Sequence, residues 1–116
     1  MRILIADDEE ALVSALSERL TLKGHSVDTA CDGAKAMAML ESMKYDIIFL
    51  DHNMPELTGL EMVKKMRQSH TDSKIVMISG YPEMEDFFAR AVGADEYLVK
   101  PLKFKEVEDI ILKYGR

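Results

Sequence analysis

Three short runs of apolar residues constrain the fold of this chain more than any other feature. They occupy residues 3–6, 47–50 and 75–78. Each run stops directly before a polar side chain: Asp7, Asp51 and Ser79. Continuous runs of this length are typical of strands that are buried on both faces of a parallel sheet. The sequence therefore predicts a central sheet that is covered by helices on both sides.

Between and after these strands, apolar residues recur at helical spacing. This spacing predicts five helices. Their stripes lie within residues 12–20, 34–41, 60–67, 84–92 and 104–114. In the second helix the stripe is assigned to Ala34, Met37, Ala38 and Glu41. We expect Gly24 to end the first helix in a left-handed conformation and Gly93 to stop the fourth.

Two further strands complete the pattern. Residues 25–30 have a mixed polar character, which suits a strand at the edge of a sheet, and residues 96–99 form the fifth strand. Five strands that alternate with five helices predict an α/β, doubly wound parallel sheet. At 116 residues the chain has the size of one domain, which we assign to residues 1–116.

Charge and cysteine content exclude several classes of protein. A net charge of −6 argues against a surface that tracks nucleic acid, because such a surface needs clustered Lys and Arg. Cys31 is the only cysteine, so an intramolecular disulfide is excluded. The sequence has no apolar run long enough to cross a membrane and no signal-peptide pattern. We therefore expect a cytoplasmic protein with no direct contact to membranes or nucleic acid.

Charged and hydroxyl side chains stand at the carboxyl ends of the predicted strands, where ligands of doubly wound sheets bind. These residues are Asp7, Asp8, Asp51, Ser79 and Lys100. Three carboxylates in one crevice repel one another unless a proton, a lysine or a metal ion compensates them. Oxygen ligands of this kind favour Mg²⁺, which also binds phosphate oxygens. The set predicts that a carboxylate attacks phosphorus to form an aspartyl phosphate.

Together these residues resemble the receiver domains of two-component response regulators. The resemblance covers residues 2–114 and includes the acidic pair, the segment 51–55, Gly59, the residues 93–95 and the Lys100-Pro101 pair. It implies a flavodoxin-like fold with strand order 2-1-3-4-5 and five flanking helices. It also implies that Asp51 is the phosphoacceptor.

The resemblance assigns the remaining site residues as well. Asp8 and Asp51 would bind Mg²⁺ together with the backbone carbonyl of Asn53, and Asp7 would act through water. Ser79 and Lys100 would contact the phosphoryl group. Tyr97 would be the aromatic residue that switches together with Ser79, and the bond between Lys100 and Pro101 would be cis.

The resemblance further implies partners. A sensor histidine kinase or a phosphotransfer protein would supply the phosphate, and a downstream protein would read it. The fourth helix, fifth strand and fifth helix would form the surface that is read, and they would also support a homodimer. Such a domain catalyses only its own phosphorylation and dephosphorylation, so it is not an enzyme that acts on other substrates.

Other interpretations remain open at this stage. An acidic pair before a helix is often only a cap, and His25, His52 and His70 are expected to be surface residues. A phosphohydrolase of the haloacid dehalogenase type also uses an aspartyl nucleophile, but that family has a second aspartate where this chain has Asn53. A receiver-like scaffold that takes no phosphate is the third possibility.

Overall fold

The chain forms a single sheet flanked by helices in a computed structural model, which describes residues 1–52, 59–68, 72–80 and 93–115. The elements in chain order are β1 (Arg2–Ala6), α1 (Glu10–Leu22), β2 (Ser26–Ala30), α2 (Gly33–Ser42), β3 (Ile47–Asp51), α3 (Gly59–Gln68), β4 (Lys74–Ser79), β5 (Glu96–Val99) and α5 (Phe104–Tyr114). The helix predicted within residues 84–92 lies outside the described residues. No helix in the described ranges is long and apolar enough to cross a membrane.

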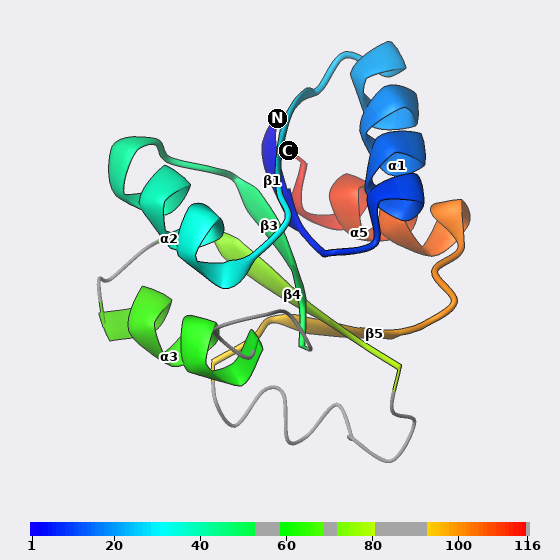
Figure 1. Ribbon diagram of the computed structural model, residues 1–116. Coiled ribbons are helices and arrows are strands. Elements are labelled where there is room, and N and C mark those ends of the chain that lie inside the picture. Colours follow the sequence, from blue (N-terminus) through cyan, green and yellow to red (C-terminus); the bar gives the residue numbers. More distant parts are fainter. Residues whose placement is uncertain (53–58, 69–71, 81–92, 116) are drawn as a thin grey trace.

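The five strands form one parallel sheet in the order β2-β1-β3-β4-β5 (Figure 1). This order confirms the predicted doubly wound fold and places β2 at an edge, as its polar residues indicate. The three apolar runs form β1, β3 and β4, the central strands. Because all strands are parallel, all their carboxyl ends meet at the same edge of the sheet.

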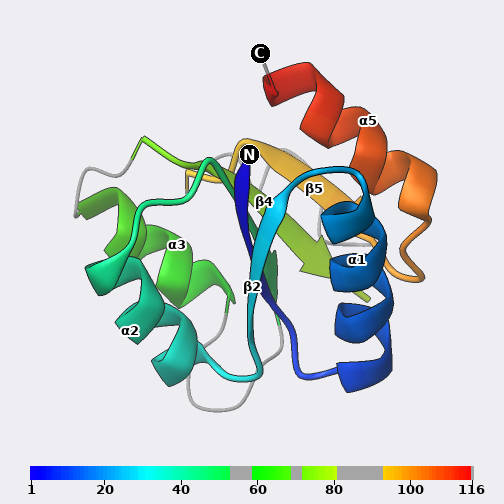
Figure 2. The same ribbon diagram turned by 90° about the horizontal axis from the view of Figure 1, so that it is seen from above.

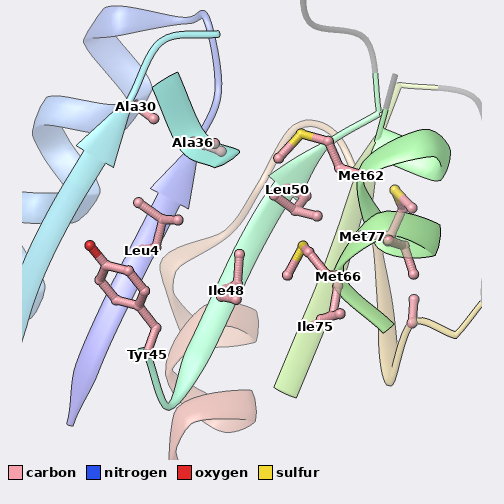
Figure 3. Packing of buried hydrophobic residues seen from close by; sticks show 13 residues of the cluster. Leu4, Ala30, Ala36, Tyr45, Ile48, Leu50, Met62, Met66, Ile75 and Met77 are labelled. Atoms are coloured by element: carbon pink, nitrogen blue, oxygen red, sulfur yellow. The ribbon is translucent and has the colours of Figure 1, made fainter. Parts of the chain in front are cut away.

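Helices cover both faces of the sheet, with α1 and α5 on one side and α2 and α3 on the other (Figure 2). Successive strand residues point to opposite faces. Leu4, Ile48 and Ile75 therefore face α2 and α3 (Figure 3), whereas Ile3, Phe49 and Val76 face α1 and α5. Burial on both sides explains why these strands contain no polar alternation.

The predicted face of α2 is wrong in part. Ala34 and Ala38 are exposed, and the buried side chain is Ala36, with Met37 and Leu40 packed beside it. Alanine is tolerated on either face of a helix, so it defines the rotation of a helix poorly. The start of the helix is set instead by Asp32, whose side chain caps it by accepting a hydrogen bond from the backbone N–H of Lys35 at 2.7 Å.

The two glycines that were expected to end helices have positive φ angles, +95° at Gly24 and +111° at Gly93. A Cβ atom on Gly24 would have no atom within 4 Å, whereas a Cβ on Gly93 would lie 2.9 Å from Cγ of Arg67. Both positions thus require the conformational freedom of glycine, and Gly93 is in addition closely packed.

These two glycines provide a matched test of backbone strain and packing. Gly24→Ala should lower the free energy of unfolding by about 1–2 kcal/mol, the cost of a left-handed conformation for an L-residue. Gly93→Ala should cost at least about 1 kcal/mol more, because its Cβ displaces the Arg67 side chain. Urea unfolding of both variants measures the difference, and equal losses would contradict the role of the Arg67 contact.

Candidate functional site

The carboxyl edge of the sheet gathers the polar residues that the sequence singles out. Asp7 follows β1, Asp51 ends β3, Ser79 ends β4 and Lys100 follows β5. Asp7, Asp51 and Ser79 are buried, with 2%, 3% and 0% of their surface exposed. Two carboxylates at this depth need compensating charge, since an unpaired buried charge is costly.

Lys100 supplies that charge. Its Nζ atom lies 3.3 Å from Oδ2 of Asp51 and 3.5 Å from Oδ2 of Asp7. The peptide bond from Lys100 to Pro101 is cis, which confirms the prediction. Burial alone would lower the pKa of Lys100, but the carboxylates of Asp7 and Asp51 outweigh it and raise the pKa. The lysine is therefore held firmly in its charged form.

The buried carboxylate of Asp7 has a hydrogen bond on only one of its two oxygens within the described residues. Its Oδ1 accepts a hydrogen bond from the backbone N–H of Glu9 at 2.9 Å, whereas its buried Oδ2 accepts none from the described residues. Burial, and to a lesser degree the charge of Asp51, raises the pKa of Asp7 to about 6, although the Glu9 N–H and Lys100 oppose this shift. Within the described residues, Oδ2 of Asp7 thus has an ion pair with Lys100 at 3.5 Å but no hydrogen bond, and its charge is only partly compensated.

A divalent cation fits this deficit. Asp7, Asp8 and Asp51 each offer one oxygen, and these oxygens lie within 4.8 Å of one another. An octahedral Mg²⁺ ion with bonds of about 2.1 Å places its ligands about 3–4 Å apart, so small side-chain rotations would bring the carboxylates or intervening waters into range. The exposed side chain of Asp8 leaves one side open to solvent. Asn53, the other expected ligand, lies outside the described residues.

Tyr97 and His52 flank the site. Tyr97 is half-buried in β5, pairs in register with Met77 and packs against the core under α2 and α3. Its role as a switch stays a prediction. His52 was expected at the surface, which is wrong in part: its ring is half-buried, and burial lowers its pKa. The reason is that its backbone continues the sheet, where its N–H donates to the carbonyl of Ile78 at 2.7 Å.

A second charged cluster positions β5, and sequence reasoning did not assign it. Arg67 of α3 donates to the carbonyl of Gly93 at 2.8 Å and to Oδ2 of Asp95 at 2.7 Å. The same Asp95 oxygen accepts the backbone N–H of Ile75 at 2.9 Å. The cluster ties the start of β5 to β4 and α3, and it thereby sets where Lys100 emerges at the other end of β5.

Sequence reasoning also overlooked Glu9. Its Oε1 lies 3.3 Å from Nζ of Lys100, the same distance as Asp51. The signal was present, because Glu9 directly continues the pair Asp7-Asp8, but an acid at this position is typical of the start of a helix.

The raised pKa of Asp7 predicts how stability depends on pH in the absence of metal. A pKa of about 6 in the folded state, against 3.8 for an ordinary aspartate, means that the folded protein binds the proton more tightly than the unfolded chain does. This contribution to stability is present below pH 4 and is lost as the pH rises through 6. Asp7→Asn should therefore be more stable than the wild type at pH 8 in EDTA, by up to about 3 kcal/mol.

Urea unfolding of the two proteins between pH 4 and pH 8 checks this expectation, because the advantage of Asp7→Asn should shrink toward the acidic end. Asp8→Asn, which removes an exposed carboxylate, is the control. An advantage of Asp7→Asn that is independent of pH would contradict the assignment.

Comparison with known proteins gives consistent matches. The family model described as "Response regulator receiver domain" matches residues 3–112. The alkaline phosphatase synthesis transcriptional regulatory protein PhoP of Bacillus subtilis is 38% identical over 107 residues, which are 91% of this chain and 45% of that protein. The chain thus spans less than half the length of this curated relative.

Solved structures of response regulators are also similar to this chain. The response regulator TrrA of Thermotoga maritima, in complex with Mg²⁺ and BeF, is 36% identical with a TM-score of 0.85 and 97% of each chain covered. A two-component response regulator from Clostridium difficile is 30% identical with a TM-score of 0.93, covering 100% of this chain and 96% of that one. In this chain the acidic cluster at the carboxyl edge is the group of side chains that could hold a metal ion among the described residues.

Proposed function

Because the chain belongs to the family of response regulator receiver domains, we propose that Asp51 is its phosphoacceptor and takes a phosphoryl group from a phosphohistidine. The observation that carries this proposal is the contact between the buried Asp51 carboxylate and Nζ of Lys100 at 3.3 Å, beside two further aspartates. A sensor histidine kinase or a phosphotransfer protein is the donor.

The transfer requires little covalent chemistry from the protein. A carboxylate oxygen of Asp51 attacks phosphorus, a P–O bond forms, and the P–N bond to the donor histidine breaks. The leaving imidazole takes a proton from solvent, and Asp51 becomes an acyl phosphate. Lys100, which already contacts Asp51, then donates to a phosphoryl oxygen, and the hydroxyl group of Ser79 at the end of β4 is the second donor.

Asp8 and Asp51 would hold Mg²⁺ directly, Asp7 would hold it through water, and the carbonyl of Asn53 would complete the protein ligands. When bound, the ion neutralises charge on the phosphoryl oxygens. The high negative charge of the site is the reason to propose it, since one lysine, Lys100, is shared by the carboxylates of Asp7, Glu9 and Asp51.

The response to phosphorylation is proposed to run through Ser79 and Tyr97. The new dianion draws the Ser79 loop toward Lys100, and Tyr97 turns on β5. The surface that a downstream protein reads then includes β5 and α5, together with the helix expected within residues 84–92, and it also supports a homodimer. Lys103 and Lys105 are exposed at the start of α5 and belong to this surface.

The proposed partners of these residues are proteins rather than nucleic acid. The relative PhoP is named a transcriptional regulatory protein, but this chain matches only 45% of it. The net charge of −6 within the chain itself disfavours direct contact with nucleic acid. The proposed partners are therefore those of the receiver domain itself.

Replacing the proposed acceptor gives the central test. Asp51→Asn should abolish acid-stable, base-labile labelling by acetyl phosphate or by a phosphorylated kinase, because an amide is not a nucleophile for phosphorus. Asp109→Asn, which alters an exposed acid of α5, should label like the wild type. Stoichiometric labelling of Asp51→Asn would refute the assignment.

Metal binding is tested without any phosphate donor. At a Mg²⁺ concentration 100 times its dissociation constant, the wild type should gain about 2.7 kcal/mol of stability by mass action. Asp8→Asn should lose most of this gain, because one direct ligand is removed. Urea unfolding with Mg²⁺ and with EDTA measures the gain, and an equal gain in Asp8→Asn would exclude that residue as a ligand.

A further inference from the structure

Glu9 occupies an unusual position for a glutamate. It is the N-cap residue of α1, where short side chains normally accept a hydrogen bond from the first turn of the helix. The Glu9 side chain makes no such bond. Its Oε1 instead lies 3.3 Å from Nζ of Lys100. The carboxylate of Glu9 is thus directed at the phosphoryl site and not at its own helix.

Three carboxylates share the single ammonium group of Lys100. Nζ lies 3.3 Å from Glu9, 3.3 Å from Asp51 and 3.5 Å from Asp7. The contacts with Glu9 and Asp51 are hydrogen bonds, and the contact with Asp7 is an ion pair without a hydrogen bond. A phosphoryl group that arrives at Asp51 competes with these three carboxylates for the ammonium group.

The three partners differ in how readily they release the lysine. The Asp7 side chain is 1% exposed and that of Asp51 is 5% exposed, so each would lose its compensating charge inside the protein. The Glu9 side chain is 61% exposed, and water can solvate its carboxylate once the contact breaks. Glu9 is therefore the partner that is released at the least cost.

We propose that Glu9 is a positioning residue of the phosphoryl site, which holds part of the Lys100 ammonium before phosphorylation and gives it up to the incoming phosphoryl group. This inference rests on the proposed role of Asp51 as the acceptor. Glu9 opposes phosphorylation in two ways: it occupies a donor of Lys100, and its negative charge stands close to an incoming dianion. The residue thereby sets how readily the domain is phosphorylated.

Glu9→Gln tests this role. At saturating Mg²⁺, its rate constant for phosphorylation by acetyl phosphate should exceed that of the wild type about two- to fivefold, the range expected for one exposed ion pair. A rate that is unchanged or lower than that of the wild type would overturn the inference.

Two comparisons separate the contact with Lys100 from the loss of a charge. Glu10→Gln removes the same charge from the next residue, which is exposed, and it should give a clearly smaller gain. In a Lys100→Met background, Glu9→Gln should give a clearly smaller gain, because the part of its effect that acts through the contact with Lys100 is already lost. An undiminished gain in this background, or an equal gain in Glu10→Gln, would overturn the inference.

A measurement that needs neither phosphate nor metal distinguishes this inference from the proposed function. The ¹⁵Nζ resonance of Lys100 should shift in Glu9→Gln and stay in place in Glu10→Gln. If the wild type takes no label from any donor, the proposed acceptor role fails, and with it the effect of Glu9 on rate. If the wild type is labelled but the Lys100 resonance does not respond to Glu9→Gln, only the inference about Glu9 fails.

Discussion

The pairing of one lysine with several carboxylates at the end of a buried sheet is the interaction on which the site depends. Asp7 and Asp51 are almost fully buried, and Lys100 is their common cation in the described part of the chain. Coulombic attraction at such depth is strong, but it repays the loss of hydration only when the geometry is well fixed. The fold must therefore hold the ends of β1, β3 and β5 in a constant relation.

The sheet fixes this relation through backbone pairing. β1 pairs with β3, β3 with β4 and β4 with β5, all in parallel register. β5 is the shortest strand of the sheet and lies at its edge, and the Arg67–Asp95 ion pair secures its start. Lys100 follows its end, and the backbone N–H of Lys100 donates to the carbonyl of Ser79 at 2.8 Å. A cluster remote from the site thus contributes to its geometry.

Much of this arrangement could be predicted from the sequence, because it rests on signals with one physical meaning. Apolar runs without alternation indicate buried parallel strands, and a polar residue directly after such a run lies at the sheet edge, as Asp7 and Asp51 do. The rotation of α2 could not be predicted from alanines that fit either face. The contact of Glu9 could not be predicted either, since an acid at a helix start has an ordinary explanation.

The balance of charge at the site connects its resting geometry with its proposed chemistry. Lys100 cannot neutralise Asp7, Glu9 and Asp51 together. Burial, and to a lesser degree the charge of Asp51, raises the pKa of Asp7 in spite of Lys100. A phosphoryl group adds two negative charges while it removes the charge of Asp51. The site would then need more positive charge than before, and in the proposed mechanism a cation beside Asp8 and the release of Lys100 by Glu9 would supply it. The same deficit would favour a bound metal ion and would make Lys100 the residue for which the acidic groups and the phosphoryl group compete.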